Sequence, residues 1–229
     1  MLQSVVFLIS AALAPPVALL LLVYHMDRLE KEPPRLLFGL FLRGAAAMVP
    51  ILVLEVLADQ FIDFFSWNYY AYLFLAYFVV PGFIEEGVKY RVLLRRIWKE
   101  PNFNCYFDAV VYAVFVSLGF AAVENVMYVL TSGFETAVAR AVFAIPGHMM
   151  FGVVMGVGIA QAKWSQHSAQ PQAAKQLRRR AFLAAAVLHG LYDFLLVGFG
   201  AFFYLYFIFL LVWVLRLLRR SAKEDRPIE

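Results

Sequence analysis

The stretch VVFLISAALAPPVALLLLVY, residues 5–24, carries no charged side chain and is long enough for one membrane-spanning helix. No Lys or Arg precedes it, and it is too long for the core of a typical signal peptide, so we expect a retained first helix. Further apolar stretches follow at about 36–57, 69–88, 109–130, 138–162, 181–197 and 200–218. The sequence therefore predicts an all-α fold, a polytopic integral membrane bundle of about seven transmembrane helices.

The composition indicates the same environment. Residues of the set AVILMFWYC make up 63% of the 229 residues, charged residues only 16%, and the mean hydropathy is +0.74. An ordinary soluble domain is about 45–50% apolar, so the composition disfavours a soluble fold. Cys105 is the single cysteine, which excludes an intrachain disulfide and a cysteine-based metal cluster. We expect one transmembrane domain over residues 1–229.

Basic residues alternate between the predicted connections. Lys and Arg number 3 in residues 24–36, 0 in 58–68, 5 in 89–106, 1 in 131–140, 5 in 163–180, 0 in 198–200 and 5 in 216–229. The positive-inside rule then places the N-terminus outside and the C-terminus in the cytoplasm. We interpret the basic run from Lys175 to Arg180 as a topology signal and a contact for anionic lipids, so the expected partner is the lipid bilayer and not nucleic acid. The Gln/Ala-rich segment 165–176 is predicted to be a flexible cytoplasmic loop.

Ionisable side chains also lie inside the predicted spans. Such a residue near a helix centre costs about 2.5–3.5 kcal/mol on insertion scales, so it usually faces a polar interior and marks a functional site. The residues singled out in this position are Glu85, Glu86, Glu124, His148, His189 and Asp193. We expect the glutamates and histidines among them to converge on one cavity. A kink at Pro81 and Gly82, a tilt, or a later start of the third span would bring Glu85 to the depth of Glu124.

The spacing of these residues suits metal binding. Residues four apart share one face of a helix, so Lys89 lies one turn from Glu85, and Asp193 lies on the face of His189. The second pair suits two metal ligands, or one ligand with the group that orients it. Zinc accepts carboxylates and imidazoles, and a divalent cation favours ionised carboxylates that burial otherwise neutralises. The pattern indicates a divalent metal, with zinc expected, although the HExxH signature is missing.

A structural interpretation of these residues is the alternative. The two adjacent glutamates would then pair with Lys89 at a helix end, and the histidines would be neutral and hydrogen-bonded at helix interfaces. Glu124 is hardest to explain in this way, because its neighbours are apolar and no Lys or Arg lies near it in sequence. The other two histidines, His25 and His167, lie in polar connections and are expected to be solvated.

Motifs in consecutive predicted helices resemble those of the PrsW family of intramembrane metalloproteases, relatives of the CAAX prenyl proteases and the bacteriocin-immunity membrane proteins. The family pattern E-E-x-x-K resembles residues 85–89, F-x-x-x-E-N resembles 120–125, a third motif is centred on His148, and H-x-x-x-D resembles 189–193. The stretch DRLEKEP, residues 27–33, is similar to the family's first connection. Together the motifs cover about residues 24–195.

The resemblance implies a peptidase of a bacterial-type inner membrane that cleaves a single-pass membrane protein, such as an anti-sigma factor, by metal- or glutamate-activated water. Its catalytic core would be about residues 69–197. Glu85 or Glu86 would be the general base or a ligand, and Lys89 or Asn125 would assist the oxyanion or hold a carboxylate. The implied metal ligands are Glu86, Glu124, His148, His189 and Asp193, the last as a ligand or an orienting group.

Peptide-bond hydrolysis requires an extended substrate, because helical carbonyls are already hydrogen-bonded, so we expect a polar cavity and a gap between helices. Two other functional classes are open at this point. An ion- or proton-coupled transporter also uses intramembrane carboxylates and histidines, although no inverted repeat is evident. A non-enzymatic immunity or scaffold protein would use the polar cluster only to fix helix packing.

Overall fold

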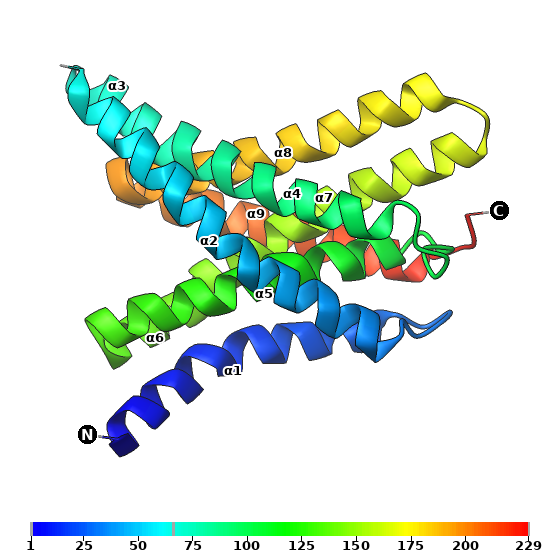
Figure 1. The fold of residues 1–229 in the computed structure, drawn as a ribbon, viewed down its shortest axis with the longest axis horizontal. Helices are drawn as coiled ribbons and strands as arrows, with labels where there is room; N and C mark the ends of the chain where they lie inside the picture. The colour runs from blue at the N-terminus through cyan, green and yellow to red at the C-terminus, as the bar shows by residue number, and fades with distance from the viewer. Residues whose placement is uncertain (1, 66, 229) are drawn as a thin grey trace.

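The structure, a computed structural model, describes residues 2–65 and 67–228. In these residues no strand is present, apart from an isolated antiparallel bridge between Cys105 and Pro227. The helices (Figure 1) are α1 Leu2–Met26, α2 Pro34–Phe64, α3 Tyr69–Phe74, the π-helix η1 Leu75–Glu85, α4 Glu86–Ile97, α5 Asp108–Ser132, α6 Phe134–Val142, α7 Ala144–His167, α8 Pro171–Gly198 and α9 Gly200–Lys223.

Within the described residues, seven helical segments are long and apolar enough to cross a membrane, which confirms the predicted polytopic helix bundle. The segments run beyond the predicted limits: α2 continues to Phe64, and α8 begins at Pro171 instead of residue 181. The prediction of a flexible loop at 165–176 is therefore wrong. Gln, Ala and Lys are good helix formers, and a proline is well placed in the first turn of a helix, so this polar segment extends α8.

The centre of the bundle is formed by α5 and α7. In the apolar windows of Asp108–Ser132 and Phe134–His167, 72% of the residues are buried, whereas the other spans reach 17% to 39%. The predicted fifth span is not one continuous helix, because the helix is interrupted at Phe143, between α6 and α7. Pro146 lacks the N–H that would bond the carbonyl four residues earlier, so a helix start is favoured here. The break brings the end of α6 close to the first turns of α7.

The third span is the continuous segment Tyr69–Ile97, which is 29 residues long. Its middle part, Leu75–Glu85, is a π-helix that contains Pro81. The proline cannot donate a backbone hydrogen bond, and wider turns of this kind are frequent at functional sites. The distortion expected at Pro81 and Gly82 thus takes the form of a π-helix. Because the span continues through α4, Glu85 lies near its middle and not at its end, which removes the difference in depth from Glu124.

A second group of buried acids lies in the α1–α2 connection and at the start of α5, at the opposite end of the bundle from the N-terminus (Figure 1). The Tyr112 hydroxyl donates to Glu32 at 2.5 Å, and Asp108 accepts from the backbone N–H groups of Asn104 and Cys105 at 3.0 and 2.6 Å. Burial raises the pKa of the Glu32 carboxyl to about 9, while the Tyr112 hydroxyl lowers it and Asp108 adds to the rise. The folded protein therefore holds a neutral carboxyl at this position at neutral pH.

The Glu32 carboxyl makes stability depend on pH. Its pKa rises from an ordinary 4.5 to about 9 on folding, so its contribution to stability is complete below 4.5 and is lost as the pH rises towards 9. Glu32→Gln cannot titrate. Between about pH 5 and about pH 8, the melting temperature of the wild type should fall about 5 °C more than that of Glu32→Gln, measured by differential scanning fluorimetry in detergent. Glu30→Gln, which changes an exposed acid, should follow the wild type, and an equal fall in all three proteins would contradict the prediction.

Candidate metal centre

The π-helix η1 packs tightly against α8, which carries His189. A Cβ atom on Gly82 of η1 would lie 2.5 Å from the carbonyl oxygen of Ala186, and a Cβ atom on Gly190 of α8 would lie 2.3 Å from the carbonyl oxygen of Phe78. Only glycine permits both approaches. The two glycines thus set the distance at which the end of η1 faces the imidazole.

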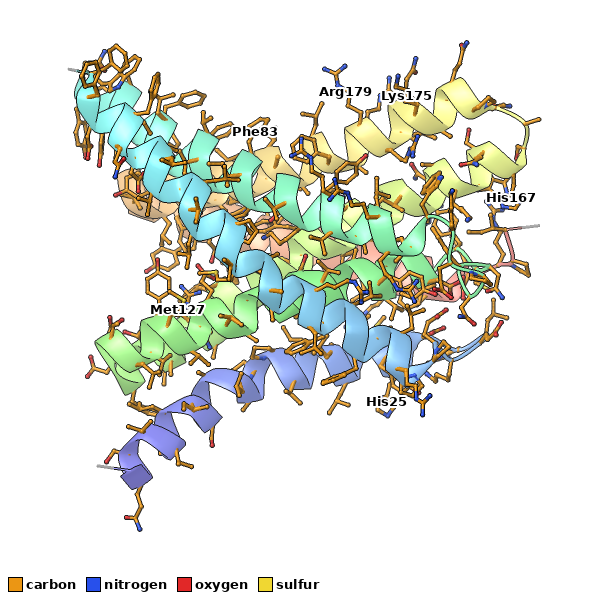
Figure 2. The ribbon with its side chains drawn as sticks, in the orientation of Figure 1. His25, Phe83, Met127, His167, Lys175 and Arg179 are labelled. Atoms are coloured by element: carbon orange, nitrogen blue, oxygen red, sulfur yellow. The ribbon has the colours of Figure 1, made fainter. Side chains whose placement is uncertain are left out.

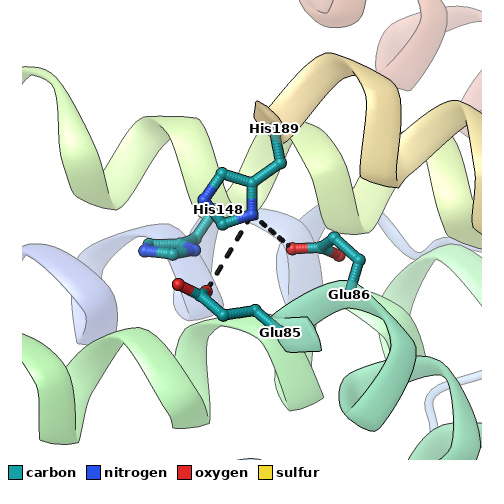
Figure 3. A group of neighbouring side chains, drawn as sticks. All are labelled: Glu85, Glu86, His148 and His189. Atoms are coloured by element: carbon teal, nitrogen blue, oxygen red, sulfur yellow. Dashed lines mark hydrogen bonds and ion pairs between the residues drawn. The ribbon is translucent and has the colours of Figure 1, made fainter. Parts of the chain in front are cut away.

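Four of the residues singled out in the sequence meet inside the bundle: Glu85, Glu86, His148 and His189 (Figure 3). Each offers one possible ligand atom, and these atoms lie within 4.8 Å of one another. All four side chains are buried, and Glu86 is fully inaccessible. They come from the η1–α4 junction, α7 and α8, so three separate parts of the chain build the group.

Each imidazole of the group has a carboxylate at its Nε2 atom. Oε2 of Glu124 lies 2.9 Å from Nε2 of His148, and Oδ2 of Asp193 lies 3.3 Å from Nε2 of His189. At the opposite ring position, Nδ1 of His189 lies 3.0 Å from Oε1 of Glu86, and Nδ1 of His148 has no hydrogen-bond partner among the described residues. A carboxylate behind a histidine orients the ring and raises its basicity. The structure thus places Glu124 and Asp193 against the imidazoles, outside the four-residue group.

The charges of the site fit a divalent cation. Nζ of Lys89 lies 2.5 Å from Oε1 of Glu86 and 3.1 Å from Oε2 of Glu85, and Nη2 of Arg140 lies 2.6 Å from Oε2 of Glu124. Asp193, beside His189, is the fourth carboxylate of the site. Four carboxylates and two basic side chains leave two net negative charges when the histidines are neutral. Oε2 of Glu86 is buried without a partner in the described part of the chain. An unpaired buried carboxylate oxygen is costly, and a cation with oxygen and nitrogen ligands removes this cost.

Arg140, in the last turn of α6, is a site residue that the sequence analysis missed. Besides its bond to Glu124, it donates from Nε to Oδ1 of Asn125 at 2.9 Å, and its guanidinium carbon lies 4.2 Å from the ring centre of Tyr128. Asn125 in turn donates to the carbonyl oxygen of Ala12 in α1 at 2.7 Å. Asn125 thus links two helices and holds Arg140. A signal was present in the sequence, since Arg140 is the single basic residue of its predicted outer connection. The sequence analysis used this residue only to predict the orientation in the membrane.

A cavity of about 200 Å³ opens beside the cluster, and its lining includes Glu85, Glu124, Arg140, His148, His189 and Asp193. Tyr192 also lines this cavity; its hydroxyl is buried and has no hydrogen-bond partner within the described residues, and the sequence analysis did not single it out. The cavity continues into a groove of about 710 Å³, with which it shares Glu85, Glu124, Arg140, Asp193 and Leu196. A polar cavity with an opening between helices is therefore present, as the sequence predicts.

Known proteins similar to this chain are membrane proteases. The family model described as PrsW family intramembrane metalloprotease matches residues 32–216. Relatives named Protease PrsW include that of Oceanobacillus iheyensis, 33% identical over 96% of this chain and 98% of the relative, and that of Bacillus subtilis, 31% identical over 96% of each. The relative from Clostridioides difficile is 36% identical over 75% of this chain and 71% of its own length. No solved structure matches the chain significantly.

These similarities extend over the apolar helices and over the buried carboxylate and histidine cluster. They do not favour a transporter or a non-enzymatic scaffold. A protease embedded in this way has two partners, the lipid bilayer around its spans and a protein substrate. The chain is a multi-pass membrane enzyme, and it belongs to the PrsW family of intramembrane metalloproteases.

Proposed function

We propose that this chain is a zinc-dependent endopeptidase that cuts a membrane-tethered single-pass protein, such as an anti-sigma factor. The observation that carries the proposal is the convergence of Glu85, Glu86, His148 and His189 within 4.8 Å beside a polar cavity. The residues that line this cavity lie between Glu85 and Leu196, which supports a catalytic core of about residues 69–197.

The metal would be held by Glu86, His148 and His189. Glu86 carries the unpartnered carboxylate oxygen, Nδ1 of His148 has no partner among the described residues, and Nδ1 of His189 faces Glu86, the proposed co-ligand. Glu124 and Asp193 would orient the two rings from the Nε2 side. A divalent cation bound there supplies a Lewis acid that polarises the scissile carbonyl and makes a water molecule more acidic.

Glu85 is the general base in this proposal. It lines both the cavity and the groove, whereas Glu86 lines neither, so Glu85 is the glutamate within reach of substrate and water. Glu85 takes a proton from the water whose oxygen bonds to the carbonyl carbon, and it delivers a proton to the amide nitrogen as the C–N bond breaks. Lys89 holds both carboxylates in place. Tyr192 lines the cavity and its hydroxyl has no partner among the described residues, so we propose this hydroxyl as the donor that would turn to the oxyanion.

The proposed orientation has the C-terminus in a bacterial cytoplasm and the N-terminus outside. The α1–α2, α4–α5 and α7–α8 connections, which carry most of the basic residues, lie with the C-terminus at the right of Figure 1, and the N-terminus lies at the left. Lys175 and Arg179 project from α8 away from the bundle in the same half (Figure 2). A basic end of this kind faces the cytoplasm in multi-pass proteins, which supports the inner membrane as the location.

The function is tested with full-length protein reconstituted with a library of single-pass reporters, each carrying a different juxtamembrane segment after one spanning helix. We expect cleavage of a subset of reporters, about one metal ion per chain by mass spectrometry, loss of cleavage on chelation and recovery with added zinc. Cleavage that persists after complete removal of metal would exclude the metal mechanism. Metal-loaded protein that cuts no reporter would exclude the protease function.

A further inference from the structure

Three carboxylates follow one face of α2: Glu55, Asp59 and Asp63, each four residues after the last. All three line the groove of about 710 Å³ that opens from the active-site cavity. The opposite walls contribute Tyr77 from η1 and Tyr128 from α5. Figure 1 shows that the C-terminal parts of α2 and α5 diverge towards the end of the bundle where the N-terminus lies. The acidic face of α2 thus runs along the path from that end to the cluster.

These three carboxylates differ from the acids at the inner end of the groove. There, Glu85 pairs with Lys89, and Glu124 pairs with Arg140. For residues 2–65 and 67–228, the ion pairs and side-chain hydrogen bonds include none to the three α2 acids. Glu55 is half-buried, whereas Asp59 and Asp63 are exposed along the groove. A carboxylate within a span is costly when it lacks a partner and usually faces a pathway or a binding site, as Glu55 does. The α2 wall of the groove therefore carries negative charges that no ion pair with a basic side chain of the described residues neutralises.

We propose that the groove binds an extended segment of the protein substrate that carries lysine or arginine residues next to the scissile bond. The inference rests on the proposed proteolytic function and adds the charge of the substrate. Glu55 and Asp63 are eight residues apart on α2, or about 12 Å at 1.5 Å per residue. An extended chain rises about 3.3 Å per residue, so the three acids flank about four residues of substrate. At least one basic residue within about four positions of the cut would pair with them.

A peptide fits this groove better than a lipid tail or an empty passage for cations. An acyl chain would leave the three carboxylates desolvated and without partners, which is unfavourable. The groove also has apolar walls, including Leu52, Val80 and Met127, which suit the remaining side chains of a peptide segment but offer nothing to a passing metal ion. Continuity with the cavity that contains Glu85 places the bound segment beside the reacting groups.

Binding is tested with the full-length protein in lipid nanodiscs and fluorescent peptides of about 12 residues that differ only in two positions, occupied by Lys, Gln or Glu. We expect the Lys peptide to bind at least about tenfold more tightly than the Glu peptide at low salt, and less selectively at high salt. In the variant Glu55→Gln/Asp59→Asn/Asp63→Asn the difference should fall to about twofold or less. The control Glu135→Gln, which changes an exposed acid of α6, should keep the wild-type preference.

Charge reversal gives a second, independent readout. The double variant Asp59→Lys/Asp63→Lys should prefer the Glu peptide, a result that a misfolded protein does not produce. Equal binding of the three peptides by the wild type, or no binding of the Lys peptide up to about 1 mM, overturns the inference. It is also overturned if the neutralised variant keeps its peptide preference and only takes up zinc more slowly, since the groove would then be a passage for cations.

Cleavage separates this inference from the proposed function. Reporters with Lys or Glu near the cut should differ in KM and less in kcat, because the α2 acids act on binding and not on the reacting atoms. A wild type that cuts both reporters with the same KM leaves the protease function intact and refutes the charge preference. A wild type that binds the Lys peptide selectively but cuts no reporter refutes the protease function and leaves the groove assignment intact.

Discussion

Glu86→Gln is expected to reduce cleavage by at least about 10³-fold, because glutamine keeps the shape of the side chain but is a poor metal ligand and cannot pair with Lys89. Glu86 is fully buried, and its Oε1 atom contacts both His189 and Lys89 at 3.0 and 2.5 Å. The metal content of the purified variant should fall together with the activity. The measurement is mass spectrometry of metal in the same sample that is assayed for reporter cleavage.

The neighbouring residue provides a matched comparison. Glu85→Gln should lower cleavage by about 10²–10⁴-fold, the range for loss of a general base, while the metal content stays near that of the wild type. If Glu85→Gln loses the metal and Glu86→Gln retains it, the roles of base and ligand must be exchanged. Undiminished cleavage by Glu86→Gln would remove this residue from the active site altogether.

His189→Ala is expected to abolish metal binding and, with it, cleavage. Its imidazole contributes one of the ligand atoms of the buried group, and alanine removes the partner of Asp193 and one of the two partners of Oε1 of Glu86. Asp193→Asn removes only the acid behind the ring, so zinc affinity should fall by about 10–100-fold without complete loss. Zinc titration with a fluorescent chelator measures both effects without a substrate.

Two histidines of the same chain serve as controls for this measurement. His25 and His167 are exposed and lie in the half of the molecule that contains most connections (Figure 2). His25→Ala and His167→Ala should keep both the wild-type metal content and the wild-type cleavage. Metal binding that survives His189→Ala but is lost in either control would mean that the metal is held elsewhere.

The candidate cluster could be recognised in the sequence because the chain is otherwise apolar. A histidine or glutamate within a spanning segment is costly, so residues such as Glu124 and His148 stand out without any knowledge of their contacts. Helical periodicity also predicted that His189 and Asp193 lie on one face, and Nε2 of His189 lies 3.3 Å from Oδ2 of Asp193. Both arguments are local, and they need only the identity of neighbouring residues and the environment of the segment.

The functions of Arg140 and Asn125 could not be inferred in this way. Arg140 reaches Glu124 because the helix is interrupted at Phe143. The Asn125 side chain donates a hydrogen bond to the carbonyl oxygen of Ala12, which is 113 positions away in the sequence. Likewise, Glu55 lies within the predicted span 36–57, but the sequence does not specify which neighbour its side chain faces. That it faces the groove depends on how α2 leans against η1 and α5. Contacts between distant segments follow from helix packing, which periodicity does not specify.

The amino-acid sequence was sufficient for the number and nature of the spans, because the cost of exposing polar groups to lipid acts on each segment separately. It was also sufficient to single out the four residues that meet in the buried group, Glu85, Glu86, His148 and His189. The proposed division of the site residues between metal ligands, general base and orienting groups required the folded bundle. Close packing at Gly82 and Gly190 and the wide turns of η1 fix which atoms meet, since side-chain chemistry at a site depends on separations of a few ångströms between segments far apart along the chain.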